Sequence, residues 1–109
     1  MNPYKLAESL YDRDSALSSL DHDILLWSND PKGVVISTDQ FLVLISIPDD
    51  PSYYHIYLLA GYPRPAAEHL VKTLPWRPRV TYKRRGALKV QSTAKWLKRL
   101  ELDEYAPKG

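Results

Sequence analysis

The chain has no cysteine among its 109 residues. Disulfide bonds, a thiolate nucleophile and the usual cysteine-rich zinc sites are therefore excluded. Glycine is also scarce, with four residues in the chain, and the sequence contains neither a glycine-rich phosphate loop nor a Gly-x-Ser-x-Gly motif. Because the common signatures of catalysis are missing, we expect a protein that is not an enzyme and that uses no metal or cofactor.

Long apolar runs are missing as well. The longest, residues 41–47, is far shorter than the roughly 20 residues that a membrane-spanning helix needs. The first residues, Met1 to Lys5, lack the charged-then-apolar layout of a signal peptide. We expect no membrane partner and no small-molecule substrate, and a location in the cytoplasm of the host cell or within a virus particle.

The composition is that of an ordinary globular protein, with 44% apolar and 26% charged residues. A chain of this length is sufficient for one hydrophobic core and hardly for two. We therefore predict a single domain over residues 1–109, with a loose polar tail over residues 103–109.

Charge is distributed unevenly along the chain. Residues 1–62 carry three basic and nine acidic side chains, a net charge of −6, whereas residues 63–109 carry twelve basic and four acidic ones, a net charge of +8. Residues 72–99 hold ten Lys or Arg and no Asp or Glu. This asymmetry favours a basic surface that faces an acidic partner, with mutual neutralisation of the two halves across the fold as the alternative.

Hydrophobic periodicity and the positions of proline, glycine and capping residues predict the secondary structure. The expected elements are a helix over 3–11, strands over 24–27, 34–38, 41–47 and 53–60, a helix over 66–74, strands over 79–85 and 88–90, and a last helix capped by Ser92 or Thr93. The fold class is α+β: an antiparallel meander of three to four strands plus a C-terminal hairpin, packed with about three short helices. Strand 41–47 is apolar on both faces, so we expect it to be central.

Simple alternation assigns side chains to faces. In strand 53–60, we expect Tyr54, Ile56, Leu58 and Ala60 to share one face. In the first helix, Leu6 and Leu10 are four residues apart and are predicted to share a face.

The order of these elements is loosely similar to that of small acetyltransferase-like domains, in which a helix follows a central meander. The resemblance implies a run of backbone amides that binds a coenzyme pyrophosphate after the third meander strand. That position reads Gly61-Tyr62-Pro63-Arg64-Pro65 and lacks the glycine-rich run. Two prolines there remove amide donors, so we expect at most a degenerate acyltransferase.

Acidic and histidine side chains form no convincing cluster. Asp21-His22-Asp23 is the nearest approach to a metal site, but neighbouring side chains of an extended segment point to opposite faces. Further ligands could come from His55 and His69 alone. We interpret residues 21–23 as a solvated turn before a strand, and the two histidines as surface or packed residues.

Tyrosine is abundant, with eight residues. Aromatic side chains with a polar tip are enriched at interfaces and are also ordinary strand residues. We assign the ordinary role to Tyr54 and expect a contact role for some of Tyr53, Tyr57 and Tyr62.

The basic segment is the best functional signal. Arginine and lysine groups of this density bind phosphates or carboxylates. We expect Val80, Tyr82, Leu88 and Val90 to point inward and Arg79, Lys83, Arg85 and Lys89 to point outward together. The predicted partner-binding residues are Trp76, Arg77, Arg79, Lys83, Arg84, Arg85, Lys89, Lys95, Lys98 and Arg99.

Three classes of function remain. The first is a non-enzymatic binding or assembly protein, for example a bacteriophage virion or accessory component, that contacts an acidic protein or a nucleic-acid backbone through the hairpin and the last helix. The second is a free nucleic-acid-binding regulator or inhibitor. The third is the degenerate acyltransferase-like enzyme.

Overall fold

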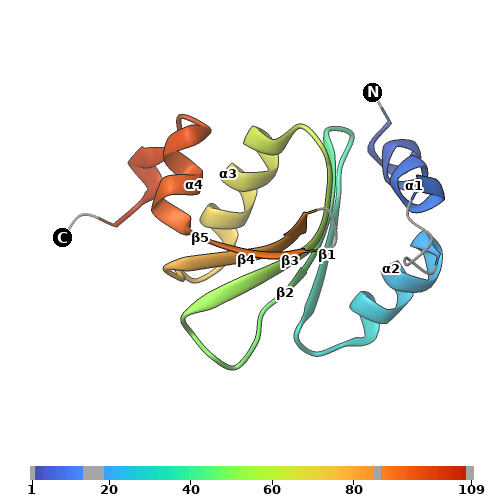
Figure 1. The fold of residues 1–109 in the computed structure, drawn as a ribbon, viewed down its shortest axis with the longest axis horizontal. Helices are drawn as coiled ribbons and strands as arrows, with labels where there is room; N and C mark the ends of the chain where they lie inside the picture. Colours follow the sequence, from blue (N-terminus) through green and yellow to red (C-terminus); the bar gives the residue numbers. More distant parts are fainter. Residues whose placement is uncertain (1, 14–18, 85–86, 108–109) are drawn as a thin grey trace.

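A computed structural model describes residues 2–13, 19–84 and 87–107 (Figure 1). It confirms the α+β class, with four α-helices and five strands. The elements are α1 (Pro3–Arg13), α2 (Leu20–Asn29), β1 (Gly33–Ser37), β2 (Phe41–Ser46), β3 (Tyr53–Gly61), α3 (Pro63–Thr73), β4 (Arg79–Arg84), β5 (Ala87–Ser92), α4 (Thr93–Arg99) and a short 3-10 helix, η1 (Asp103–Tyr105).

The five strands form one mixed sheet in the order β1-β2-β3-β4-β5. The pairs β1–β2, β2–β3 and β4–β5 are antiparallel, as the predicted meander and hairpin require. The pair β3–β4 is parallel, because α3 connects the two strands as a crossover. None of the helices within the described ranges is long and apolar enough to cross a membrane.

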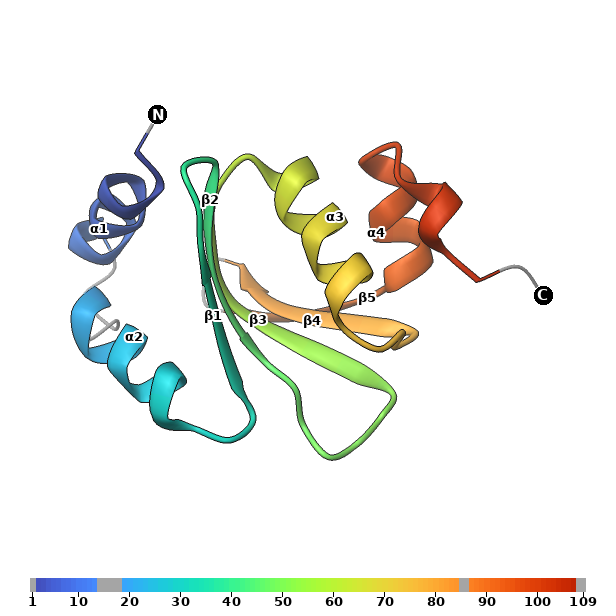
Figure 2. The ribbon, with the colours of Figure 1, turned by 180° about the vertical axis from the view of Figure 1, so that it is seen from behind.

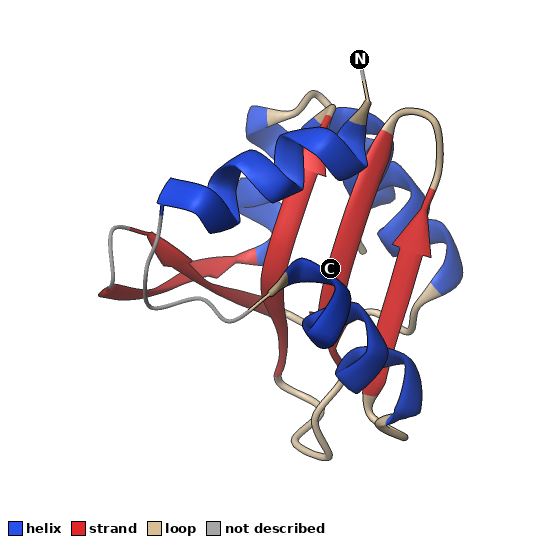
Figure 3. Cartoon of the chain, turned by 90° about the vertical axis from the view of Figure 1, so that its right-hand side faces the viewer, coloured by secondary structure: helices blue, strands red, loops and turns tan. Residues whose placement is uncertain are grey.

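Helices cover the sheet from both sides (Figures 1 and 2). Helices α1 and α2 pack on strands β1 to β3 from one side, which we call the α1/α2 face. Helices α3 and α4 pack on the other side, which we call the α3/α4 face. In Figure 3, α1 and α2 lie in front of three strands, and the β4–β5 hairpin extends to the left beyond them.

Strand β2 is the most deeply buried part of the sheet. Val43 and Ile45 pack toward α3, and Leu42 and Leu44 pack toward α1 and α2. None of these four side chains is more than 2% exposed. The prediction of a strand that is covered on both faces is confirmed, although β3 is the strand in the middle of the sheet.

The prediction that one face of β3 carries its four apolar residues is wrong, because the strand contains a β-bulge. Leu44 of β2 pairs with Leu58 and the next residue, Ile45, pairs with Ile56, so Tyr57 is an extra residue in β3. The bulge reverses the alternation. Ile56 belongs to the core under α3, whereas Leu58 belongs to the core under α1 and α2.

The prediction of a strand over residues 24–27 is also wrong, because these residues lie in α2. The hydroxyl of Ser19 caps this helix by accepting a hydrogen bond from the amide of His22 at 3.1 Å. Leu20 and Ile24 recur at helical spacing and pack in the core under the helix. In the apolar run 24–27, Ile24 and Trp27 therefore lie on the packed side of the helix, and Leu25 and Leu26 lie on its solvent-exposed side.

Helix α1 begins at Pro3, as predicted, but it faces the core with other residues than expected. The Asn2 side chain accepts a hydrogen bond from the Lys5 amide at 3.3 Å. Ala7 and Tyr11 are buried against the sheet, whereas Leu6 is 41% exposed. The predicted apolar face is therefore displaced by one residue around the helix.

The chain reverses direction after α4. Glu101 adopts a positive φ of 60°, the Leu102 amide donates to the Leu97 carbonyl at 2.8 Å, and the Glu101 amide donates to Lys98 at 3.1 Å. This Schellman arrangement turns Leu102 back into a small core with Leu97. Helix η1 follows, and residues 108–109 of the expected tail lie outside the described residues.

Replacing Val43 with Asp should lower the free energy of unfolding by about 4 kcal/mol or more, because an unpaired carboxylate would be buried in the central layer. Chemical denaturation measures this loss. Val90→Asp is the control, because Val90 is 59% exposed and should tolerate a charge. A Val43→Asp protein as stable as its parent would contradict the burial of β2.

Candidate functional site

The β4–β5 hairpin distributes the predicted basic surface over two faces of the sheet. Lys83 pairs with Leu88 and Thr81 pairs with Val90, whereas Tyr82 pairs with Lys89. Paired residues point to the same side. The prediction that Leu88 and Val90 point inward is therefore wrong: they lie on the α1/α2 face with Lys83. Lys89 lies on the α3/α4 face, away from Lys83.

On the α1/α2 face, the hairpin forms one wall of an open groove of about 620 Å³, which we call the hairpin groove. Leu88 is 60% exposed and Val90 is 59% exposed. The β2–β3 loop forms the opposite wall. The lining residues are Ser46, Pro48, Asp50, Ser52, Tyr53, His55, Arg79, Thr81, Leu88 and Val90.

A hydrogen-bonded pair lies at the bottom of the hairpin groove. The Thr81 hydroxyl lies 3.2 Å from the Tyr54 carbonyl and 2.8 Å from Nδ1 of His55. Because the hydroxyl proton goes to the carbonyl, we assign the Nδ1–H tautomer to His55, which then donates to Thr81. Burial, followed by repulsion from Lys83, lowers the pKa of His55 below its usual value. Neutral His55 is therefore a positioned polar group.

The α3/α4 face carries the second group of cations. Lys95, Lys98 and Arg99 are exposed on α4 and line a shallow hollow with Gln91 of β5, which we call the α4 basic patch. The Arg99 guanidinium donates a hydrogen bond to the Gln91 side chain. This contact fixes Arg99 without neutralising it, so the patch keeps its positive charge.

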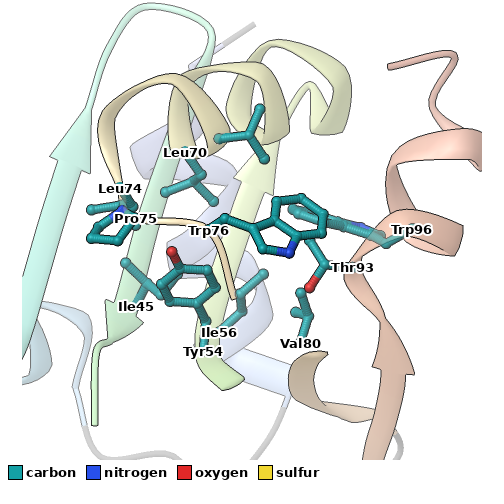
Figure 4. A pocket seen from close by; sticks show the side chains of 11 residues that line it. Ile45, Tyr54, Ile56, Leu70, Leu74, Pro75, Trp76, Val80, Thr93 and Trp96 are labelled. Atoms are coloured by element: carbon teal, nitrogen blue, oxygen red, sulfur yellow. The ribbon is translucent and has the colours of Figure 1, made fainter. Parts of the chain in front are cut away.

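Trp76, a predicted contact residue, is 38% exposed and lies beside an apolar pocket under α3. Figure 4 shows its indole ring and that of Trp96 next to the pocket, with Tyr54 on the sheet. The interior space is about 10 Å³, which is room for about one water molecule. The buried hydroxyls of Tyr54 and Thr93 have no hydrogen-bond partner among the described residues. The pocket is thus a packing gap, and Trp76 covers it.

Arg77, another predicted contact residue, is bound within the fold. Its Nη1 atom lies 2.6 Å from the Pro48 carbonyl and 2.9 Å from the carbonyls of Asp50 and Tyr53. Its guanidinium carbon lies 5.2 Å from the Tyr54 ring centre, over the ring. Arg77 therefore holds the β2–β3 loop in place and with it one wall of the hairpin groove.

Six of the ten predicted residues are exposed cations: Arg79, Lys83, Lys89, Lys95, Lys98 and Arg99. Within the described ranges, the ion pairs are Lys32–Asp49 and Lys72–Glu68, both at 2.8 Å, and neither includes one of the six. Mutual neutralisation across the fold is therefore not achieved by direct ion pairs among these residues. The side chains of Arg84 and Arg85 lie outside the described part.

The Asp21-His22-Asp23 sequence lies in the first turn of α2, not in an extended turn. The Asp23 carboxylate accepts hydrogen bonds from the phenols of Tyr11, at 2.6 Å, and Tyr57, at 3.0 Å. Asp21 accepts from Tyr4, and this bond raises the pKa of Tyr4 to about 12. Across the described residues, no group of three His, Asp or Glu is placed to hold a metal ion.

The tyrosines with an expected contact role lie in different places. Tyr57 stacks on Trp27, with ring centres 4.4 Å apart, and hydrogen-bonds Asp23 inside the fold. Tyr53 lines the hairpin groove, and Tyr62 is 49% exposed at the end of β3. Tyr53 therefore adjoins the hairpin in the groove, and Tyr57 also lines a hollow with Tyr82 and Lys83 of the hairpin.

The chain matches no model of a known protein family, no curated protein and no solved structure. Its function is therefore argued from the hairpin groove and the α4 basic patch. Sequence reasoning missed the groove because it assigned Leu88 and Val90 to the core. The length of the link between β4 and β5 would have revealed this. Arg84 pairs with Ala87, so two residues lie between the paired ends, and each even-numbered residue of one strand pairs with an odd-numbered residue of the other. Leu88 and Val90 therefore pair with Lys83 and Thr81, not with the inward-facing Val80 and Tyr82.

Replacing Arg77 with Ala should lower the free energy of unfolding by about 2 to 4 kcal/mol, because three carbonyls lose a charged donor. Arg79→Ala removes the same charge from an exposed position and should change stability by about 0.5 kcal/mol or less. Urea denaturation of both variants measures the difference. Equal, small effects would show that Arg77 is a free contact residue, as the sequence predicted.

Proposed function

We propose that this protein is a non-enzymatic binding or assembly protein that holds an acidic partner through the β4–β5 hairpin and α4. The observation that carries the proposal is the set of six exposed cations without an ion-pair partner among the described residues. They lie on the hairpin groove, on β5 and on the α4 basic patch. A partner that contacts the hairpin along β5, which is an edge strand, can reach both the α1/α2 face and the α3/α4 face of the sheet.

Fold stability does not account for this concentration of charge. An exposed ion pair contributes about 0 to 1 kcal/mol, and here the pairs are not formed. Like charges on one hairpin repel one another, which disfavours the compact state. A carboxylate or phosphate partner removes this repulsion, and the positive field accelerates its approach.

Two double variants, each of which removes two positive charges, test the proposal. Arg79→Ser with Lys83→Ser removes two charges at the hairpin groove, and Lys95→Ser with Lys98→Ser removes two at the α4 basic patch. The parent should bind labelled polyglutamate or a random-sequence DNA duplex at low salt, with affinity falling about ten-fold or more at high salt. At least one double variant should bind more weakly at an unchanged melting temperature.

Fluorescence anisotropy measures the binding and also separates the two kinds of acidic partner. Preference for polyglutamate supports an acidic protein, and preference for the duplex supports the nucleic-acid-binding alternative. A parent protein that binds neither polymer at low salt would contradict the proposal.

A degenerate acyltransferase is a second candidate, favoured by one observation beyond the order of the elements. The parallel pairing of β3 with β4 covers four residue pairs, 53–56 with 79–82, although β3 continues to Gly61. A hollow of about 350 Å³ lies beside this point, lined in part by Tyr82, Gln91 and Trp96. A ligand that separates two parallel strands would fit such a place.

The start of α3 argues against this candidate. In the first turn of the helix, Pro63 and Pro65 have no amide hydrogen, and the Ala66 amide already donates to the Tyr62 carbonyl at 3.4 Å. Among the first four residues, Arg64 is left as the one amide donor for an anion. A coenzyme pyrophosphate requires several such donors.

Acetyl coenzyme A should therefore leave the melting temperature unchanged, because a ligand stabilises a fold in proportion to its binding. Differential scanning fluorimetry with free coenzyme A as the reference compound measures this. A saturable rise in melting temperature with acetyl coenzyme A would support the acyltransferase candidate.

A further inference from the structure

We infer that the hairpin groove binds the α2 surface of a second copy of this chain. The inference rests on the proposed function, since it names the acidic partner that the basic hairpin holds. It begins from two exposed apolar pairs in the described part of the molecule. Leu88 and Val90 lie in the groove, 60% and 59% exposed, and Leu25 and Leu26 lie on the outer side of α2, 61% and 49% exposed.

The hairpin groove lacks the layer that covers the rest of its side of the sheet. Helices α1 and α2 pack on β1, β2 and β3, and the hairpin extends beyond them (Figure 3). A sheet face with apolar side chains is normally buried by another element. A helix placed over Leu88 and Val90 would continue the layer that α1 and α2 begin.

Charge complementarity selects the occupant. Arg79 lines the groove, and Lys83 lies outside its lining but on the same side of β4 as the apolar pair. Two exposed carboxylates flank the two leucines: Asp21, in the first turn of α2, is four residues before Leu25, and Asp30, which follows the last residue of the helix, is four residues after Leu26. Both surfaces therefore combine two exposed apolar side chains with two like charges, and the charges of the two surfaces are opposite.

The spacing of these charges also agrees. Arg79 and Lys83 are four residues apart on a strand, which spans about 13 Å at roughly 3.3 Å per residue. Asp21 and Asp30 are nine residues apart along a helix, which spans about 13 Å at 1.5 Å per residue. The agreement concerns the spacing along the axis: nine residues also turn the helix by about half a revolution, so Asp21 and Asp30 lie on either side of the leucines.

The opposite wall of the groove restricts how the helix lies. Asp50 is on that wall, and its carboxylate accepts a hydrogen bond from the Ser52 amide at 2.9 Å. This carboxylate repels an acidic partner, so we expect the carboxylates of the bound helix to lie nearer to the hairpin than to this wall. His55 at the bottom of the groove has an unprotonated Nε2 in the assigned tautomer and can accept a hydrogen bond from a donor on the bound helix.

Self-association explains more of the chain than an unrelated acidic partner does. It accounts for the acidic front half and the basic back half together, with net charges of −6 and +8. It also accounts for exposed leucines on both surfaces. A nucleic acid would use the cations but would leave Leu88 and Val90 in contact with a charged backbone.

Two variants with one damaged surface each provide the test. The groove variant carries Leu88→Thr and Val90→Thr, and the helix variant carries Leu25→Gln and Leu26→Gln. Tyr62→Ser is the matched control, because Tyr62 is 49% exposed and belongs to neither surface. All five substitutions in these three variants are at exposed positions, so melting temperatures should stay near that of the parent.

Analytical ultracentrifugation of the full chain over a concentration series measures association. The parent and Tyr62→Ser should exceed the mass of one chain as concentration rises, and high salt should weaken this association. The groove variant and the helix variant should each associate at least about ten-fold more weakly. An equimolar mixture of the two should associate more strongly than either alone, because the intact α2 of one meets the intact groove of the other.

Three results would overturn the inference: a parent that keeps the mass of one chain throughout, variants that associate like the parent, or a mixture no stronger than its components. A monomeric parent that still binds polyglutamate or DNA would leave the proposed function standing without this partner. A monomeric parent that binds neither polyglutamate nor DNA would contradict both the proposed function and this inference.

Discussion

The β-bulge at Tyr57 allows one strand to support both halves of the fold. Before the bulge, Tyr54 and Ile56 face the core under α3, and after it Leu58 and Ala60 face the core under α1 and α2. The parallel pairing with β4 ends at Ile56, next to the bulge. A bulge increases the local twist of a strand, so the hairpin departs from the rest of the sheet at this point. The hollow of about 350 Å³ that is lined in part by Tyr82, Gln91 and Trp96 lies beside this point.

The extra residue also fixes the helical layer on the α1/α2 face. The Tyr57 ring stacks on Trp27, and its hydroxyl donates to the Asp23 carboxylate on α2. The Tyr11 phenol of α1 donates to the same carboxylate, and burial with this bond raises the pKa of Tyr11 far above its usual value. One buried carboxylate thereby joins two helices to the bulge. Because α2 is held by its inner side, its outer side is presented in a defined orientation.

Local signals in the sequence were sufficient for most elements. β-Branched runs and turn residues predicted β1 and β2 to within one residue of their observed bounds, and Ser92, one of the two expected caps, caps α4. Helix α3 was predicted from residue 66, but it begins at Pro63. The α2 helix was mistaken for a strand because four consecutive apolar residues outweighed the Ser19 cap and the spacing of Leu20 from Ile24. The mistake shows that a short apolar run does not distinguish the two kinds of element.

The remaining errors concern register, which alternation alone does not determine. A bulge adds one residue and exchanges the faces of everything after it, and nothing in the sequence of residues 53–60 marks Tyr57 as that residue. In the hairpin, the apolar character of Leu88 and Val90 suggested an inward orientation, but the pairing of Arg84 with Ala87 places them on the open face. Six of the ten predicted residues are therefore exposed cations, but they do not form one surface, because Lys83 and Lys89 lie on opposite faces of the sheet.

Arg77 holds one wall of the hairpin groove in place from within the fold. Its guanidinium is bound to three carbonyls of the segment 48–53, and that segment forms the wall of the hairpin groove opposite Leu88 and Val90. The next cation, Arg79, begins β4 on the other side of the groove, and its amide donates to the Ser52 carbonyl at 3.0 Å. The two arginines therefore join the loop to the hairpin at one end of the groove. The width of the groove therefore depends on the same bonds that join the loop to the hairpin and stabilise the fold.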